Sequence, residues 1–385
     1  MSERTRVLTD PGDPTAEHAS VDTIGFVLSR PYGTVVARRM RRTFDAVASA
    51  VEALRSGAAP AMVGAIPFAR EHPSALSVPE SLTMTAAGWA PTVSPKRMPE
   101  WAISGSDASE HLERVATVVR LLRQQTGPLM KVVLARRMTL RSEVALAPLD
   151  LLSALVERTP TGDGYYVDLS AAGGAFVGTS LVGSSPEVLI RRRGSRVTCH
   201  PLAGSAPRHA DPRTDRRNGG DLLESTKDLR EHAFVVDAIR TALEPFCSSL
   251  TVPDAPSLTH TPQLWHLGTP MEGVLRHSST TSLELAVALH PTPAVCGTPT
   301  DLAYEVIDRL EGDRAFYGGA VGWCDAHGDG DWMVSIRCAQ IGADGRRVTA
   351  YAGGGIVAES DPESELRETD TKFGTVLEAL GVRRS

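Results

Sequence analysis

The 385-residue sequence predicts an α+β protein in which strands and helices form separate layers. Runs rich in β-branched residues, joined by Gly-rich turns as in antiparallel hairpins, occur in the middle and at the end of the chain. Amphipathic segments with helical spacing lie in blocks of their own. The two patterns therefore do not alternate as they would in a doubly wound parallel sheet.

The first hundred residues carry the weaker signals. Residues 1–20 are polar and contain two prolines, so we expect a loose leader. Short strand-like runs then surround one expected helix over residues 42–55 and a buried strand over residues 62–68. Pro, Ser and Thr are frequent over residues 70–100, where we expect a long surface excursion.

An amphipathic helix is predicted after residue 106, because its apolar residues recur at helical spacing: Leu112, Val115, Val118, Val119 and Leu122. Gly127 and Pro128 supply its stop signal. The next segment, residues 129–140, is a strand by its β-branched content. Its alternation places Lys131 on the same face as Val133 and Ala135.

The rest of the chain continues both patterns. Strands are expected at 165–169, 175–180, 187–193, 196–204, 318–325, 332–341 and 347–357, and helices at 221–245, 281–289, 300–311 and 363–380.

Composition excludes several functional classes. A net charge of -6 and a pI near 6.0 argue against a nucleic-acid partner. The basic runs are short: residues 38–42 predict the solvated face of a helix, and residues 191–196 a hairpin turn. The sequence has neither a membrane-spanning apolar run nor a signal peptide, so we expect a cytoplasmic location and no membrane partner. Five cysteines without a CxxC pair favour neither disulfides nor zinc.

Two pairs of carboxylates stand at expected helix starts. Asp228 and Glu231 are three residues apart, as are Glu365 and Glu368, so each pair lies on one helix face. Acidic residues are common in a first turn because the helix dipole favours them, and this explanation suffices for either pair alone.

The four carboxylates together favour a Mg²⁺ site, because this ion prefers oxygen ligands. Four direct carboxylates would be too many for it. We therefore expect Glu231 and either Glu368 or Glu365 to bind directly, with Asp228 and the remaining glutamate acting through water. The ion would clamp a substrate anion rather than ionise a nucleophile.

A set of longer motifs resembles the chorismate-utilising enzymes, and isochorismate synthases most closely. The motifs are KVVLARR (131–137), GSSPEVLIRR (183–192), HPLAGSAPR (200–208), ESTKDLREH (224–232), LWHLGT (264–269), HPTPAVCG (290–297), YGGAVGWCD (317–325), SIRCAQ (335–340) and AGGGIVAESDPESELRET (352–369). They run in order over about residues 115–380. The resemblance implies one catalytic domain over residues 21–385, with two largely antiparallel sheets packed in a sandwich and helices on the outer faces.

The resemblance also implies a reaction: Mg²⁺-dependent conversion of chorismate to isochorismate, with water adding at ring carbon 2 and the hydroxyl leaving carbon 4. Lys131 matches the general base, and desolvation on an apolar strand face would lower its pKa toward neutral. Glu187 matches the general acid, and burial would raise its pKa and keep part of it protonated. Without the surrounding motifs, a snorkelling lysine and a surface glutamate would explain both.

Chorismate is a dicarboxylate, so its site must supply positive charge and backbone donors. By the resemblance, Mg²⁺ holds one carboxylate, and Arg337 and Lys372 hold the other together with the amides of the AGGGI loop. The residues carried over for substrate binding are Gly204, Ser205, His266, Arg337, Gly353, Gly355 and Lys372. His266 alone would be explained as a core histidine.

Other branches of the family fit less well. Relatives that add ammonia typically carry glutamine in place of Lys131, and the aminodeoxychorismate branch has a lysine where this chain has Ala203. Salicylate synthase, which goes on to eliminate pyruvate, is the main alternative, although residues 225–228 and 290–294 favour isochorismate as the product. A non-catalytic chorismate-binding regulator would be expected to lack the general acid, the general base or a metal-binding carboxylate. We expect a monomer without an amidotransferase subunit.

Overall fold

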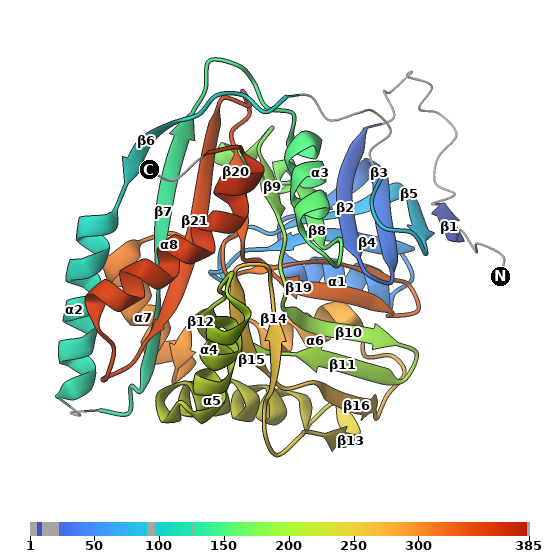
Figure 1. Ribbon diagram of the computed structural model, residues 1–385. Coiled ribbons are helices and arrows are strands. Elements are labelled where there is room, and N and C mark those ends of the chain that lie inside the picture. The colour runs from blue at the N-terminus through green and yellow to red at the C-terminus, as the bar shows by residue number, and fades with distance from the viewer. Residues whose placement is uncertain (1–5, 10–22, 91–96, 125–126, 383–385) are drawn as a thin grey trace.

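The strands form one long antiparallel ladder and a separate small sheet (Figure 1). The computed structural model describes residues 6–9, 23–90, 97–124 and 127–382. Following hydrogen-bonded neighbours, the ladder contains β6 (Ala102–Ser106), β7 (Lys131–Arg141), β21 (Arg347–Ile356), β20 (Cys338–Ile341), β9 (Ser180–Gly183), β8 (Gly164–Asp168), β2 (Ile24–Arg30), β3 (Gly33–Phe44), β5 (Ala75–Thr85), β4 (Ala61–Ile66), β18 (Ala320–Asp325), β19 (Gly330–Val334), β10 (Val188–Arg193), β11 (Arg196–His200), β16 (Met271–Leu275) and β13 (Cys247–Thr251). β1 (Arg6–Thr9) pairs with β5, and β17 (Gly297–Thr298) pairs with β7.

The ladder folds on itself, so that its two halves pack as the layers of a sandwich. Phe26 of β2 and Tyr165 of β8, from one half, share a buried cluster with Trp323 of β18 and Met333 of β19, from the other. Val27, the neighbour of Phe26, packs on the opposite face, as the period of two requires. The predicted sandwich of antiparallel layers is confirmed, and β3 and β5 pair over most of their length with one shift of register between Met40 and Arg42.

Helices cover both outer faces. One face carries α2 (Ala108–Arg123), α3 (Pro148–Arg158), α7 (Thr300–Glu311) and α8 (Pro362–Ala379). The other carries α1 (Val47–Arg55), α5 (Thr226–Leu243) and α6 (Ser282–Leu289). α4 (Pro212–Glu224) packs on the small sheet of β12 (Leu202–Pro207), β15 (Leu264–Gly268) and β14 (Ser257–His260). Two short 3₁₀ turns, Ser170–Ala172 and Gly174–Phe176, lie between β8 and β9. Figure 1 shows α8 lying across β21 and β7.

The predicted helix after residue 106 and the strand that follows it are confirmed as α2 and β7. The apolar stripe of α2 is buried because Val115 and Val119 pack in one cluster with Val132 and Leu134 of β7. Both faces of β7 are apolar near its start, since Val133 also is buried, on the side away from α2. This strand therefore lies between two packed regions.

Other local predictions were wrong. The basic run at residues 38–42 lies in β3, where pairing with β5 overrides its helical appearance, and the helix expected from residue 42 begins at Val47. The expected excursion over residues 70–100 contains the largely buried strand β5. Of residues 175–180, the first two end a 3₁₀ turn and only Ser180 is in a strand, at the start of β9, and α3 was not predicted.

Of the predicted leader, only Arg6–Thr9 belongs to the described residues, where it forms β1 against β5. The remaining residues of the segment 1–20 lie outside the described part. Within the described ranges, no helix combines the length and apolarity needed to cross a membrane.

Candidate active site

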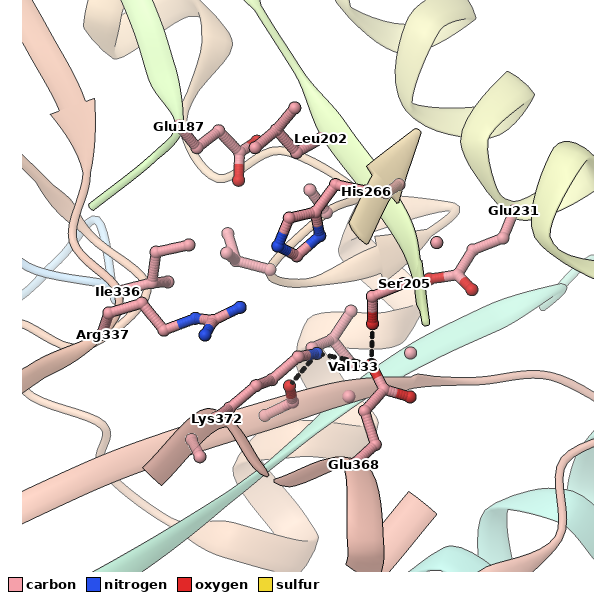
Figure 2. A pocket seen from close by; sticks show the side chains of 18 of the residues that line it. Val133, Glu187, Leu202, Ser205, Glu231, His266, Ile336, Arg337, Glu368 and Lys372 are labelled. Carbon is pink, nitrogen blue, oxygen red and sulfur yellow. Dashed lines mark hydrogen bonds and ion pairs between the residues drawn. The ribbon is translucent and has the colours of Figure 1, made fainter. Parts of the chain in front are cut away.

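A polar cavity lies where β12, β15 and β21 meet the segment before β10 and the helices α5 and α8. It is lined by Val133, Pro186, Glu187, Leu202, Ala203, Gly204, Ser205, Lys227, Asp228, Glu231, His266, Ala294, Val295, Tyr317, Ile336, Arg337, Tyr351, Ala352, Gly353, Gly354, Gly355, Glu368 and Lys372. Every predicted site residue lines this central cavity except Lys131 and Glu365, which lie directly behind its wall. Figure 2 shows Glu187 and Glu231 on opposite sides of it.

Lys131 begins β7 and is fully buried. Its Nζ lies 2.8 Å from Oε1 of Glu231 on α5, so the predicted base and a predicted metal ligand form an ion pair. Gly355 on the neighbouring strand β21 makes this pairing possible. A Cβ at Gly355 would stand 2.3 Å from Glu231 Oε1 and 2.8 Å from Lys131 Cε, so a larger residue here would have to displace the ion pair.

Glu187 stands between β9 and β10 and is only 3% exposed. Burial raises the pKa of its carboxyl to about 8, although a hydrogen bond from the Leu202 backbone and the charges of Lys131, Lys372 and Arg337 oppose the shift. The carboxyl therefore holds its proton at neutral pH. This is the state that a general acid needs.

Arg337 and His266 complete the end of the cavity near Glu187, which we call the acid end. Burial lowers the pKa of Arg337 to about 10, so the guanidinium remains charged, and its Nη1 is buried without a hydrogen-bond partner among the described residues. Burial also lowers the pKa of His266 to about 3, together with the charges of Arg337 and Lys372. The acid end thus offers a neutral imidazole and one unsatisfied cation.

Arg337 interrupts the strand predicted over residues 332–341. β19 ends at Val334 and β20 begins at Cys338, and Arg337 between them has φ 51°, a left-handed conformation that is unfavourable for a residue with a Cβ. The break aims the guanidinium into the central cavity (Figure 2). Strained backbone of this kind is concentrated at functional sites.

The opposite end, which we call the carboxylate end, contains Asp228, Glu231, Glu365 and Glu368. Glu368 on α8 pairs with Lys372 one turn later, at 2.7 Å between Oε1 and Nζ, and Ser205 Oγ donates to the same oxygen at 2.7 Å. Burial alone would raise the pKa of Glu368, but Lys372 and these hydrogen bonds lower it. Lys372 also donates to the Gly353 carbonyl at 2.8 Å, which ties α8 to β21.

The helix expected over residues 221–245 begins later, as α5 at Thr226 after α4 has ended, and the cap of α5 positions Asp228. The Ser225 hydroxyl caps the helix by accepting from the Asp228 backbone N–H, and it donates to the Asp228 carboxylate. Burial raises the pKa of Asp228, and the charges of Glu231 and Glu368 add to the shift. Gly204 of β12 lies against Asp228 with φ +81°, so this position requires glycine both for its backbone and for space.

Glu365 is the most buried carboxylate of this end, at 2% exposed. Its Oε1 accepts from Ser360 Oγ at 2.7 Å and from Lys227 Nζ at 3.2 Å. Its Oε2 is buried without a hydrogen-bond partner among the described residues. Burial raises the pKa of Glu365, and the charge of Glu368 raises it further.

These observations suit an oxygen-liganded cation. Neighbouring carboxylates raise the pKa of Asp228 and of Glu365, and one buried oxygen has no partner among the described residues, so a divalent ion would relieve repulsion and satisfy that oxygen. Among the described residues, however, no three His, Cys, Asp or Glu side chains are already arranged to hold a metal. Lysines pair with Glu231, Glu365 and Glu368 instead.

Sequence reasoning did not identify several lining residues: Val133, Leu202, Lys227, Tyr317 and Ile336. Lys227 and Tyr317 lay within recognised motifs, directly beside Asp228 and in YGGAVG, so their proximity to known positions was a usable signal. Leu202 and Ile336 also lie within recognised motifs, and Ile336 directly precedes Arg337, but their apolar side chains indicate no chemistry of their own.

Comparison with known proteins agrees with this site. Residues 84–381 match the family described as "Chorismate binding enzyme". The chain is 49% identical over 369 residues to the MenF protein of Mycobacterium tuberculosis, covering 93% of this chain and 96% of that one. It is 44% identical over 336 residues to the isochorismate synthase DhbC of Bacillus subtilis, covering 84% and 81%. The crystal structure of DhbC from Bacillus anthracis superposes with a TM-score of 0.84 at 38% identity, covering 94% of this chain and 97% of that chain.

These matches confirm the resemblance that the sequence motifs indicated and the predicted fold class. The family match spans most of the chain and includes every residue of the central cavity. The chain therefore belongs to the chorismate binding enzyme family.

Proposed function

We propose that this protein is an isochorismate synthase, an isomerase that converts chorismate into isochorismate. The observation that carries the proposal is the acid end: a buried carboxyl that holds its proton, Glu187, shares one cavity with a guanidinium, Arg337, that has an unsatisfied donor. The likeness to DhbC of Bacillus subtilis, which is named an isochorismate synthase, supports this choice of reaction.

Lys131 is proposed as the general base and Glu187 as the general acid. The Lys131 ammonium first loses its proton to solvent, and its neutral amine then accepts a proton from the water whose oxygen bonds to ring carbon 2. The two ring double bonds shift, and the bond between carbon 4 and its hydroxyl oxygen breaks. Glu187 donates its proton to that oxygen, which leaves as water. One water enters and one leaves, so the product is an isomer of the substrate.

Arg337 is proposed to hold a substrate carboxylate through its unpartnered Nη1, because a planar guanidinium can bind a carboxylate with two parallel hydrogen bonds. The backbone of Gly353 and Gly355 lines the same cavity, next to Lys372. These cations face a dianion, which explains why the site gathers positive charge around a neutral acid.

Mg²⁺ is the proposed cofactor. Glu231 and either Glu368 or Glu365 would hold it directly, and Asp228 and the remaining glutamate would act through water. When bound, the ion would neutralise a substrate carboxylate. The partnerless Oε2 of Glu365 and the mutual repulsion of these carboxylates support the proposal.

The test is to incubate the purified chain with chorismate and Mg²⁺ and to separate the products by chromatography. We expect isochorismate alone, and no conversion after chelation of the metal or with Glu187→Ala. Salicylate together with pyruvate would establish the alternative of a salicylate synthase. Binding of chorismate without any product would instead establish a non-catalytic chorismate-binding protein.

A further inference from the structure

Lys227 has no role in the proposed reaction, yet it lies inside the carboxylate end. It stands in the first turn of α5 and lines the central cavity beside Asp228 and Glu231. Its Nζ reaches across to α8, 3.2 Å from Oε1 of Glu365, whose side chain is only 3% exposed. The lysine side chain itself is 35% exposed, so its ammonium can leave this contact without first being freed from a packed core.

The charge of Lys227 acts on the same carboxylates that are proposed to hold the metal. Its ammonium contacts Glu365, and the lysine shares the cavity lining with Asp228 and Glu231. A lysine is ordinarily a cation at neutral pH. In the chain without metal, the ammonium thus provides part of the positive charge that this group of carboxylates requires.

We infer that Lys227 is a tethered cation that competes with the divalent ion at Glu365 and thereby sets the metal affinity of the site. The inference rests on the proposed function, from which it takes the metal. An ion that uses Oε1 of Glu365 must displace the ammonium, and an ion that uses the partnerless Oε2 must bind close to it. Both arrangements weaken metal binding, the first by competition and the second by repulsion.

Such a cation also serves the substrate. Chorismate is a dianion, and carboxylates without a counter-charge would repel it from the cavity before any metal arrived. Lys227 keeps Glu365 paired during that interval and can be released when the divalent ion takes over. Lys227 therefore pairs with Glu365 in the metal-free site and leaves that contact in the metal-loaded site.

The test is isothermal titration of Mg²⁺ into the metal-stripped full chain, with and without chorismate. Lys227→Met should bind Mg²⁺ at least about fivefold more tightly than the unchanged chain, the factor that corresponds to about 1 kcal/mol for a partly exposed ion pair. Lys227→Arg keeps the charge and should keep the original affinity. Arg230→Met is the matched control, because it removes the same charge one turn along α5 from a side chain that lies over the Phe234 ring.

The outcomes separate this inference from the proposed function. Equal or weaker Mg²⁺ binding by Lys227→Met, with measurable binding by the unchanged chain, overturns the inference alone. An equal gain in Arg230→Met also overturns it, because the effect would then be one of general charge. Absence of Mg²⁺ binding in all chains, with chorismate present, overturns both. A circular dichroism melt of each variant, with Lys227→Gln as a second neutral substitution, identifies any chain that is not folded.

Discussion

The two ends of the central cavity use the same side chain in opposite ways. Glu187 at the acid end is 3% exposed, and no lysine or arginine lies within ion-pair distance of it among the described residues. Burial raises its pKa to about 8. The Glu368 side chain at the carboxylate end is 28% exposed and has Lys372 at 2.7 Å, and its pKa is lowered.

The comparison shows that the neighbours of a carboxyl and its burial together decide its charge. A carboxyl that loses water and gains no cation remains a proton donor. Glu368, held against an ammonium and a hydroxyl, remains an anion that can serve a metal, whereas burial and the charge of Glu368 raise the pKa of Glu365 in spite of similar partners. This cavity obtains both from glutamates by placing lysines at one end only.

The largest expected effect comes from removing the proton donor or acceptor. Glu187→Gln and Lys131→Gln should each lower kcat by about 10²–10⁴-fold, because neither amide can transfer a proton in place of the original group. The measurement is isochorismate formation at saturating chorismate and Mg²⁺. Rates near those of the unchanged chain in both variants would contradict the assignment of acid and base.

Glu231→Gln should damage the carboxylate end and leave the acid end intact. Its affinity for Mg²⁺ should fall by at least about tenfold, since a neutral amide is a poorer ligand for this ion than a carboxylate. The decline of kcat/KM above about pH 8 that Glu187 imposes should persist when Mg²⁺ is saturating. If that decline disappears, the two ends are not independent.

Arg337→Lys should weaken substrate binding by roughly 10–100-fold in kcat/KM, because an ammonium cannot form the paired hydrogen bonds of a guanidinium. The charge is kept, so Mg²⁺ affinity measured by titration should not change. Steady-state kinetics over a range of chorismate concentrations makes the comparison. An unchanged kcat/KM would show that Arg337 does not contact the substrate.

Glu187→Gln should also stabilise the fold, by an amount that depends on pH. Below pH 4.5 both the folded and the unfolded chain hold the proton of Glu187, and between pH 4.5 and about 8 only the folded chain does. The free energy of unfolding of the original chain therefore falls through this window, and glutamine avoids that loss. Urea titrations should show equal stability near pH 4 and an advantage of a few kcal/mol for the variant at pH 9. A constant difference at both pH values would show that burial does not control this carboxyl.

Local sequence patterns were sufficient where one element determines its own structure. The apolar stripe of α2 follows from helical spacing within one element. β5 and the run at residues 38–42 were misjudged, because their strand state depends on pairing with each other over some forty positions of the chain. No local pattern reports such a partner.

The site was predictable to the extent that its motifs were. Glu187, Ser205 and Arg337 were identified from short stretches, and all three belong to the wall of the cavity. That Lys131 lies behind this wall and pairs with Glu231 could not be foreseen, since it depends on how β7, β21 and α5 meet in space. The pairing of Lys227 with Glu365 was missed for the same reason, because it joins α5 to α8.

The left-handed conformation of Arg337 gives the site a separable cost. Any residue with a Cβ at this position lowers the free energy of unfolding by about 1 kcal/mol relative to glycine. Both Arg337→Ala and Arg337→Gly should be inactive toward chorismate, but the glycine chain should melt at the higher temperature. The chain thus has an arginine at a backbone position where glycine would give a more stable fold. The orientation of the guanidinium toward the cavity has been kept at the expense of stability.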